Sequence, residues 1–153
     1  EPDLEHVLDH MCANESHNVL LHEIGETEAG KLLGTQWKDM LNDIPRSKTE
    51  LQMRAVRDHL ADCLSTLPSL IEEEKLPSIH FYFANFTAMR KELFPTAFAA
   101  YHKWADGGDL KPLKKAAEQG RQHWHAVASE LLDNWRSKGA EHIARFDELI
   151  SPL

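Results

Sequence analysis

The chain has 153 residues, of which 42% are hydrophobic and 27% charged, and its formal net charge is −8 with histidine neutral. A chain of this length buries a sizeable core as one domain, without disulfides or a structural metal. Acidic chains with scattered Lys and Arg are poorly suited to nucleic acid or to anionic membrane surfaces. We therefore expect a single domain over 1–153 with no nucleic-acid partner, and no membrane insertion, because the apolar runs are too short.

The hydrophobic pattern has a helical period along nearly the whole chain. It predicts four long helical segments at roughly 3–43, 48–75, 78–105 and 110–150. Short connections make sequential segments antiparallel. Pro68 and Pro95 lie inside the second and third segments, where a proline kinks or ends a helix. The predicted fold is all-α, an antiparallel up-down-up-down four-helix bundle with kinks near Pro68 and Pro95.

Local signals mark where several of these segments begin and end. Pro45 is expected to end the first segment, because the residue before a proline is biased away from the helix. Ser47 and Glu50 form a capping box, in which the Ser47 hydroxyl accepts from the Glu50 backbone. Asp109 follows a Gly-Gly turn and is a good N-cap for the last segment.

The stretch GETEAGKL, Gly25 to Leu32, resembles a phosphate-binding loop at every position but the last. Leu32 replaces the hydroxyl that would bind magnesium, the local glutamates repel phosphate, and the chain offers no parallel sheet. We therefore interpret the glycines structurally. Gly25, Ala29 and Leu33 are four apart and form a strip for close helix packing. A continuous helix is favoured over a break at Gly25 or Gly30.

Ten histidines are the most unusual feature of the composition. His6 and His10 are one helical turn apart, as are His59 and Cys63, and such pairs on facing helices can close a tetrahedral zinc site. The candidate metal ligands are therefore His6, His10, His59 and Cys63. The alternative is that these histidines have no ligand role. Cys12 and Cys63 could form a disulfide, but buried free thiols are the favoured interpretation.

Two short stretches resemble parts of known signalling proteins. His22-Glu23 is similar to the phospho-accepting pair of two-component dimerisation helices, but the residues that usually follow that pair are replaced here. Leu33-Gly34-Thr-Gln-Trp37 with the later His59 and Cys63 is similar to the zinc-binding sensor domains of bacterial chemoreceptors and diguanylate cyclases. Lys31 stands where that family has a cysteine, and the likeness covers under half of the chain. Neither stretch assigns a family.

A cluster of aromatic residues extends from 81 to 104 and could line a small-molecule pocket between helices. Kinks at Pro68 and Pro95 would open space beside it. The candidate ligand-binding residues are Phe83, Phe86, Phe98, Tyr101 and Trp104. The alternative is that these side chains pack in the core.

No catalytic set is recognisable, so we expect a protein that is not an enzyme. The leading interpretation is a sensory or small-ligand-binding helical-bundle domain of a bacterial-type signalling protein, without a resident cofactor. The alternatives are a small acidic inhibitor or immunity-type protein that covers a basic site on a partner, and a zinc-binding helical bundle. A small molecule or a protein is thus the expected partner, and a homodimer is also open. The sequence slightly favours a cytoplasmic location.

Overall fold

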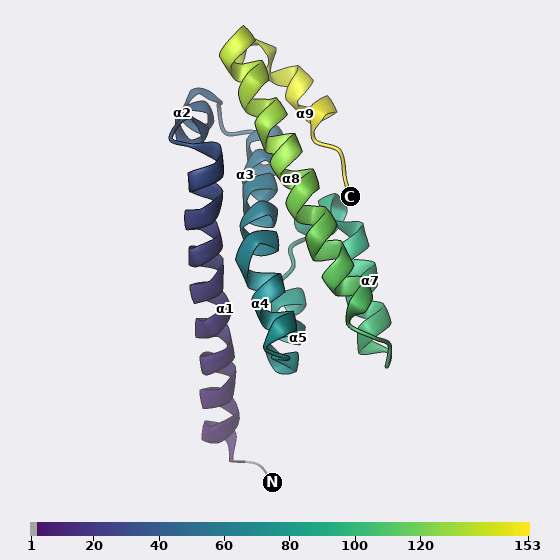
Figure 1. Ribbon diagram of the computed structural model, residues 1–153. Helices are drawn as coiled ribbons and strands as arrows, with labels where there is room; N and C mark the ends of the chain where they lie inside the picture. Colours follow the sequence, from purple (N-terminus) through teal and green to yellow (C-terminus); the bar gives the residue numbers. More distant parts are fainter. Residues whose placement is uncertain (1–2) are drawn as a thin grey trace.

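The computed structural model describes residues 3–153, apart from the side chains of residues 143 and 144. The chain begins with the long helix α1 (Leu4–Leu33), which the Asp3 side chain caps. The helix ends at Gly34, whose φ of 73° favours glycine. A short helix, α2 (Gln36–Asp43), follows and stops before Pro45, so the single helical segment predicted over 3–43 is wrong in one respect: it is two helices, broken at Gly34. The stretch from Gly25 to Leu32 is therefore continuous helix, as the favoured interpretation predicted (Figure 1).

The second predicted segment is one helical rod with a widened turn inside it. It consists of α3 (Lys48–Ala61), the π-helical turn η1 (Asp62–Thr66) and α4 (Leu67–Glu72). Ser47 caps α3, and its hydroxyl oxygen accepts from the Glu50 backbone at 3.2 Å. Pro68 lies in the first turn of α4. The irregularity near it is the π-helical turn, which ends two residues before Pro68. Such turns occur frequently at functional sites.

The third predicted segment is not a single kinked helix, and this part of the prediction was wrong. It is divided into α5 (Leu76–Ala84), α6 (Ala88–Leu93) and α7 (Pro95–Ala105). Thr87 starts α6 as its side-chain cap, accepting from the Arg90 backbone. Phe94 has a non-helical backbone, and Pro95 opens α7 in a position where its missing N–H costs nothing. The chain therefore begins a new helix after Thr87 and another at Pro95, although the hydrophobic spacing continues across both positions.

The last segment is the long helix α8 (Lys111–Lys138), which ends at Gly139 with a φ of 66°. A 3₁₀ segment, η2 (Ala140–Arg145), and the short helix α9 (Phe146–Leu149) reverse the chain direction. The final residues then run back beside α7. The Leu153 backbone accepts from Thr96 at 3.1 Å and donates to Leu93 at 2.9 Å, which bridges the break between α6 and α7.

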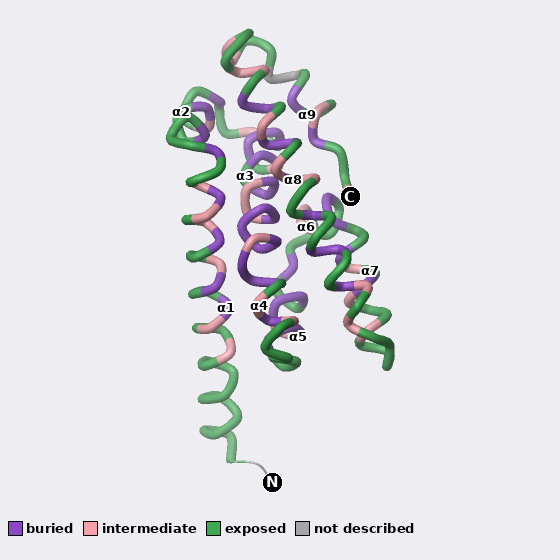
Figure 2. The backbone as a smooth tube through the Cα atoms, in the orientation of Figure 1, coloured by how far each residue is buried: buried purple, intermediate pink, exposed green. Residues whose placement is uncertain are grey.

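The long helices pack side by side, with α3 between α1 and α8 and with α7 against α8 (Figure 1). Helix α1 approaches α3 closely at Gly25, where an added Cβ would lie 2.1 Å from the Ala61 carbonyl oxygen. Figure 2 shows the buried residues gathered on the facing sides of the helices, whereas the N-terminal half of α1 extends past them and is exposed. Large core side chains include Trp124, Phe83 and Phe94.

The all-α class is confirmed, since every regular element in residues 3–153 is helical. A four-helix bundle as such is not confirmed, because the third segment is three short helices. None of the helices in the described part of the chain has the length and apolarity needed to cross a bilayer.

Candidate functional site

The structure does not bring the four predicted metal ligands together. His6 and His10 lie beside each other on the exposed end of α1, with ring centroids 4.5 Å apart. His59 and Cys63 are buried on α3 and η1. Helix α1 meets this region at Gly25, which lies about four helical turns beyond His10. The fold therefore keeps the two predicted pairs apart.

His59 is instead a neutral residue of the core. Its ring stacks on Trp124 at 5.0 Å and contacts Phe94 and Phe86 at 5.3 and 5.5 Å. Burial lowers the pKa of His59 to about 3. Neither ring nitrogen has a hydrogen-bond partner among the described residues. Cys63 and Cys12 are both free thiols, one buried and one exposed, so the disulfide alternative is wrong and the expected burial of Cys12 is also wrong.

The predicted aromatic residues pack against one another, with Phe83 and Phe86 buried and the other three half-buried: Phe83, Phe86, Phe98, Tyr101 and Trp104. Phe83 stacks on Tyr101 with centroids 4.4 Å apart, and Phe86 lies parallel to Phe98 at 6.3 Å. None of the five lines the polar pocket described next. Their geometry is that of core packing, the alternative considered above.

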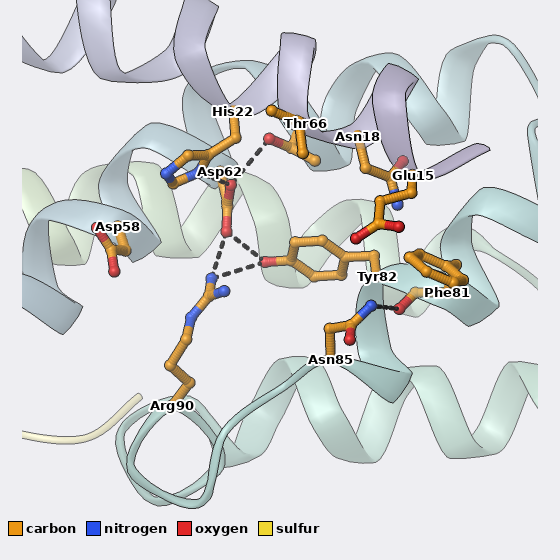
Figure 3. Close-up of a pocket in the computed structure, with 11 residues that line it drawn as sticks. Glu15, Asn18, His22, Asp58, Asp62, Thr66, Phe81, Tyr82, Asn85 and Arg90 are labelled. Carbon is orange, nitrogen blue, oxygen red and sulfur yellow. Dashed lines mark hydrogen bonds and ion pairs between the residues drawn. The ribbon is translucent and has the colours of Figure 1, made fainter. Parts of the chain in front are cut away.

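A pocket of about 280 Å³ lies beside this aromatic cluster, between α1, the α3–η1 rod, α5 and the start of α6 (Figure 3). Most of its lining side chains are polar. It is formed by Glu15, Asn18, Val19, His22, Asp58, Asp62, Thr66, Phe81, Tyr82, Asn85 and Arg90. Because these residues come from separate elements, only the folded chain assembles the pocket.

Asp62 is the centre of a buried hydrogen-bond network on the wall of this pocket. Figure 3 shows side chains from three other elements directed toward its carboxylate. His22 of α1 and Tyr82 of α5 each bond to it at 2.8 Å, and Thr66 donates to it from one turn away, also at 2.8 Å. Arg90 of α6 donates to the same carboxylate and also to the Tyr82 hydroxyl at 3.1 Å. One carboxylate thus ties α1, η1, α5 and α6 together.

The network keeps Asp62 ionised and favours a protonated His22. Burial alone would raise the pKa of Asp62, but the Arg90 guanidinium and the His22 hydrogen bond hold it well below its usual range. The hydrogen bond to Asp62 raises the pKa of His22, against the opposing effect of burial, and the charges of Asp58 and Glu26 add to this. Burial raises the pKa of Asp58 as well.

Two further carboxylates lie near the His22 imidazole. Glu26 lies one helical turn away, with 4.0 Å between His22 Nε2 and Glu26 Oε1. Asp58 faces them from α3, and one potential ligand atom from each of the three residues lies within 4.8 Å of the others. Among residues 3–153 the Asp58 carboxylate makes no direct hydrogen bond, but the charges of Arg90 and His22 lower its pKa against the effect of burial. This arrangement places two carboxylates, which can accept hydrogen bonds, beside an imidazole that Asp62 holds in position.

The sequence marked His22 as a candidate residue but did not identify its partners. It paired His22 with the adjacent Glu23, whereas the structure pairs it with Asp62 and brings Glu26 and Asp58 near. The sequence carries no signal for this role, because Asp62 lies opposite the apolar stripe of its helix, where a polar residue is ordinary, and only the structure shows that this side is buried too. Buried carboxylates need partners, but nothing in the sequence identifies Arg90 as one of them.

Residues 1–152 match a family model described as "Family of unknown function (DUF6866) C-terminal domain". The match spans all the helices that form the pocket. No curated protein and no solved structure matches the chain.

Proposed function

The chain belongs to the DUF6866 family of unknown function, and we propose that it is a non-catalytic helical domain that binds a small ligand in the Asp62 pocket. The convergence of four elements on one buried carboxylate supports this proposal. A ligand in the pocket contacts residues of α1, η1, α5 and α6 at the same time. Its binding would favour one relative placement of these elements, which is how a sensory domain converts occupancy into a signal.

The free groups of the pocket indicate the chemical class of the ligand. Arg90 is already paired with Asp62, so their charges compensate each other. Asp58 and Glu15 add two further carboxylates to the lining. Two atoms of the pocket are buried without a hydrogen-bond partner in the described chain, the acceptor Asn18 Oδ1 and the donor Arg90 Nε. Counting the Asp58 and Glu15 carboxylates, acceptors outnumber donors among these groups. We propose that the ligand is a small cation, either an organic ammonium compound or a metal ion, since such ligands complement acceptors.

A titration with a defined panel of small ammonium compounds tests the proposal. Nitrogen-15 labelled protein is mixed with primary, secondary and quaternary amines, and backbone amide shifts are recorded. We expect at least one compound to shift the amides of His22, Asp58 and Tyr82 together. Val19 lines the pocket and is 54% exposed, so Val19→Trp should block it without burying a new group. Val7→Trp, on the exposed part of the same helix, is the matched control.

The proposal for an organic ligand is supported if Val19→Trp abolishes the shifts and Val7→Trp leaves them. It is contradicted if no amine in the panel produces saturable shifts, or if binding persists unchanged in Val19→Trp.

A protein partner is the second candidate, and the projecting half of α1 favours it. Leu4 is 70% exposed, Leu8 49% and Met11 48%. The three side chains share one face of the helix, because they are spaced by about one turn each. A second copy of the chain could cover this stripe, in line with the homodimer considered from the sequence.

Analytical ultracentrifugation tests the homodimer. A concentration-dependent dimer that Leu8→Lys dissociates supports this candidate, and a monomer at all concentrations contradicts it. The expected antiparallel bundle, with its third segment made of α5–α7, remains the proposed scaffold in either case.

A further inference from the structure

We infer that His22, Glu26 and Asp58 form a binding site for a divalent first-row transition-metal ion, with Zn²⁺ as the best-suited probe. The site lies at the edge of the Asp62 pocket and joins α1 to α3. The inference rests on the proposed function insofar as it names a metal ion as the cationic ligand of that pocket. It differs from the combination predicted from the sequence, because the fold keeps the α1 terminal histidines apart from His59 and Cys63.

The three residues are arranged as a chelate. His22 and Glu26 lie at i and i+4 on one face of α1, and Asp58 approaches from α3. Their ligand atoms are within 4.8 Å of one another. Ligand atoms around a tetrahedral zinc ion lie roughly 3.4 Å apart, because each is about 2.0–2.1 Å from the metal. The Glu26 side chain is 29% exposed. A rotamer change there can therefore close the gap without moving the backbone.

The imidazole is already oriented for a metal. Its Nδ1 atom bonds to the buried Asp62 carboxylate at 2.8 Å, which leaves Nε2 free, 4.0 Å from a Glu26 carboxylate oxygen. Metal-binding histidines almost always bond through the second nitrogen to a carboxylate or carbonyl, which fixes the ring orientation. Asp62 is itself held by Thr66, Tyr82 and Arg90. The groups that would support a metal-bound imidazole are therefore in place before any metal binds.

The charges of the cluster match a divalent ion. Asp58 makes no direct hydrogen bond among residues 3–153, although the charges of Arg90 and His22 act on it. Glu26 shares its charge mainly with Arg57 at 3.2 Å. Two carboxylates neutralise a divalent cation, and one imidazole nitrogen selects a transition metal over magnesium or calcium. Three protein ligands leave at least one coordination position open, as in catalytic sites. Asp58 and His22 also line the pocket, so this position faces it.

Calorimetric titration with ZnCl₂ tests the inference in a His10→Gln background, which removes the exposed His6–His10 pair as a competing chelate. We expect one zinc ion per chain. Glu26→Gln and Asp58→Asn should each weaken binding by at least about tenfold. Glu23→Gln changes the charge of α1 equally at an exposed position beside the site, and it should leave affinity within about twofold. Arg57→Gln should strengthen binding, because it frees Glu26.

Nitrogen-15 spectra of the histidine rings give a second measurement, in which zinc should shift the Nε2 signal of His22. The inference is overturned if zinc does not bind, or if binding is the same in Glu26→Gln and Asp58→Asn as in the control. An ammonium compound that binds the wild type and is blocked by Val19→Trp would then leave the proposed function standing. Failure of both ligand types overturns both.

Discussion

Asp62 is 1% exposed, and its carboxylate bonds to a guanidinium, an imidazole and two hydroxyl groups. A buried ion pair of this kind contributes little net stability compared with apolar residues of similar volume. Removing only one of its charges is costly, however, because the other charge stays buried. Asp62 is therefore better explained by the organisation of a pocket than by stability.

Asp62→Ala should lower the free energy of unfolding by about 3–5 kcal/mol, because it leaves the Arg90 guanidinium without its partner. The double variant Asp62→Leu/Arg90→Met removes both charges and should be less destabilised than Asp62→Ala alone. Urea unfolding followed by circular dichroism measures both values. A double variant that is as unstable as the sum of the two single variants would contradict this explanation.

His59 should make stability fall in mild acid. In the unfolded chain this histidine is protonated near its ordinary pKa of 6.5, whereas in the folded chain its pKa is about 3, so it stays neutral down to about that pH. Between these values, the unfolded state binds the extra proton, so stability falls by about 1.4 kcal/mol per pH unit. Above pH 6.5 both states are neutral and the effect vanishes. The raised pKa of Asp58 acts in the opposite direction in the lower part of this window, because the folded state then binds the extra proton.

His59→Leu isolates this contribution. Leucine has a similar volume and removes two ring nitrogens that have no partner in the described chain, so stability at pH 7 should be unchanged or higher. Between pH 6.5 and 4.5 the variant should lose less stability than the wild type, while Asp58 contributes equally to both. Parallel pH dependences for the two proteins would show that His59 is not buried as a neutral group.

At the scale of elements, the glycines of α1 differ in their role although they lie close together in sequence. A Cβ at Gly25 would lie 2.1 Å from the Ala61 carbonyl oxygen, and a Cβ at Gly30 would have nothing within 4 Å. Gly25 therefore permits the contact between α1 and α3 that also brings His22 to Asp58 and Asp62. Gly30 only weakens the helix.

Gly25→Ala should destabilise the chain by about 1–3 kcal/mol, because the added methyl group forces the two helices apart. Gly30→Ala is the matched control and should stabilise it by about 0.5–1 kcal/mol, the usual gain in a helix interior. Thermal unfolding of the two variants measures the difference. The opposite order of stabilities would mean that the helices do not approach each other at Gly25.

At the scale of the whole molecule, the two ends of the described chain behave differently. The first half of α1 extends beyond the other helices and is exposed, whereas the last residues are tied to the break between α6 and α7. The Ser151 carbonyl also bonds to His123 of α8 at 2.7 Å. The C-terminal segment therefore holds α6, and with it Arg90, against the rest of the fold.

Deletion of residues 151–153 should cost roughly 2–4 kcal/mol, because three hydrogen bonds to the rest of the fold are lost. Leu153→Ala keeps the backbone bonds and should cost clearly less. Chemical denaturation of both proteins, with tryptophan fluorescence as the signal, measures the difference. Equal losses would assign the effect to the Leu153 side chain instead of the backbone bridge.

The sequence by itself determined the helical class, the Ser47 cap, the end of the first segment before Pro45 and the close-packing role of Gly25. These features depend on residues within a turn or two, where spacing and propensity act directly. The division of residues 78–105 into α5, α6 and α7 was missed, because the hydrophobic stripe continues across the restarts at Thr87 and Pro95.

Only the tertiary structure decided the candidate site. The partners of Asp62 are separated from it by 40 residues at His22, 28 at Arg90 and 20 at Tyr82, and no local pattern relates such positions. The same limit explains why the predicted ligand pairs lie apart, since helical spacing pairs His59 with Cys63 but does not say which part of α1 meets them. A buried charge finds its partners through packing of whole helices, which a one-dimensional period does not encode.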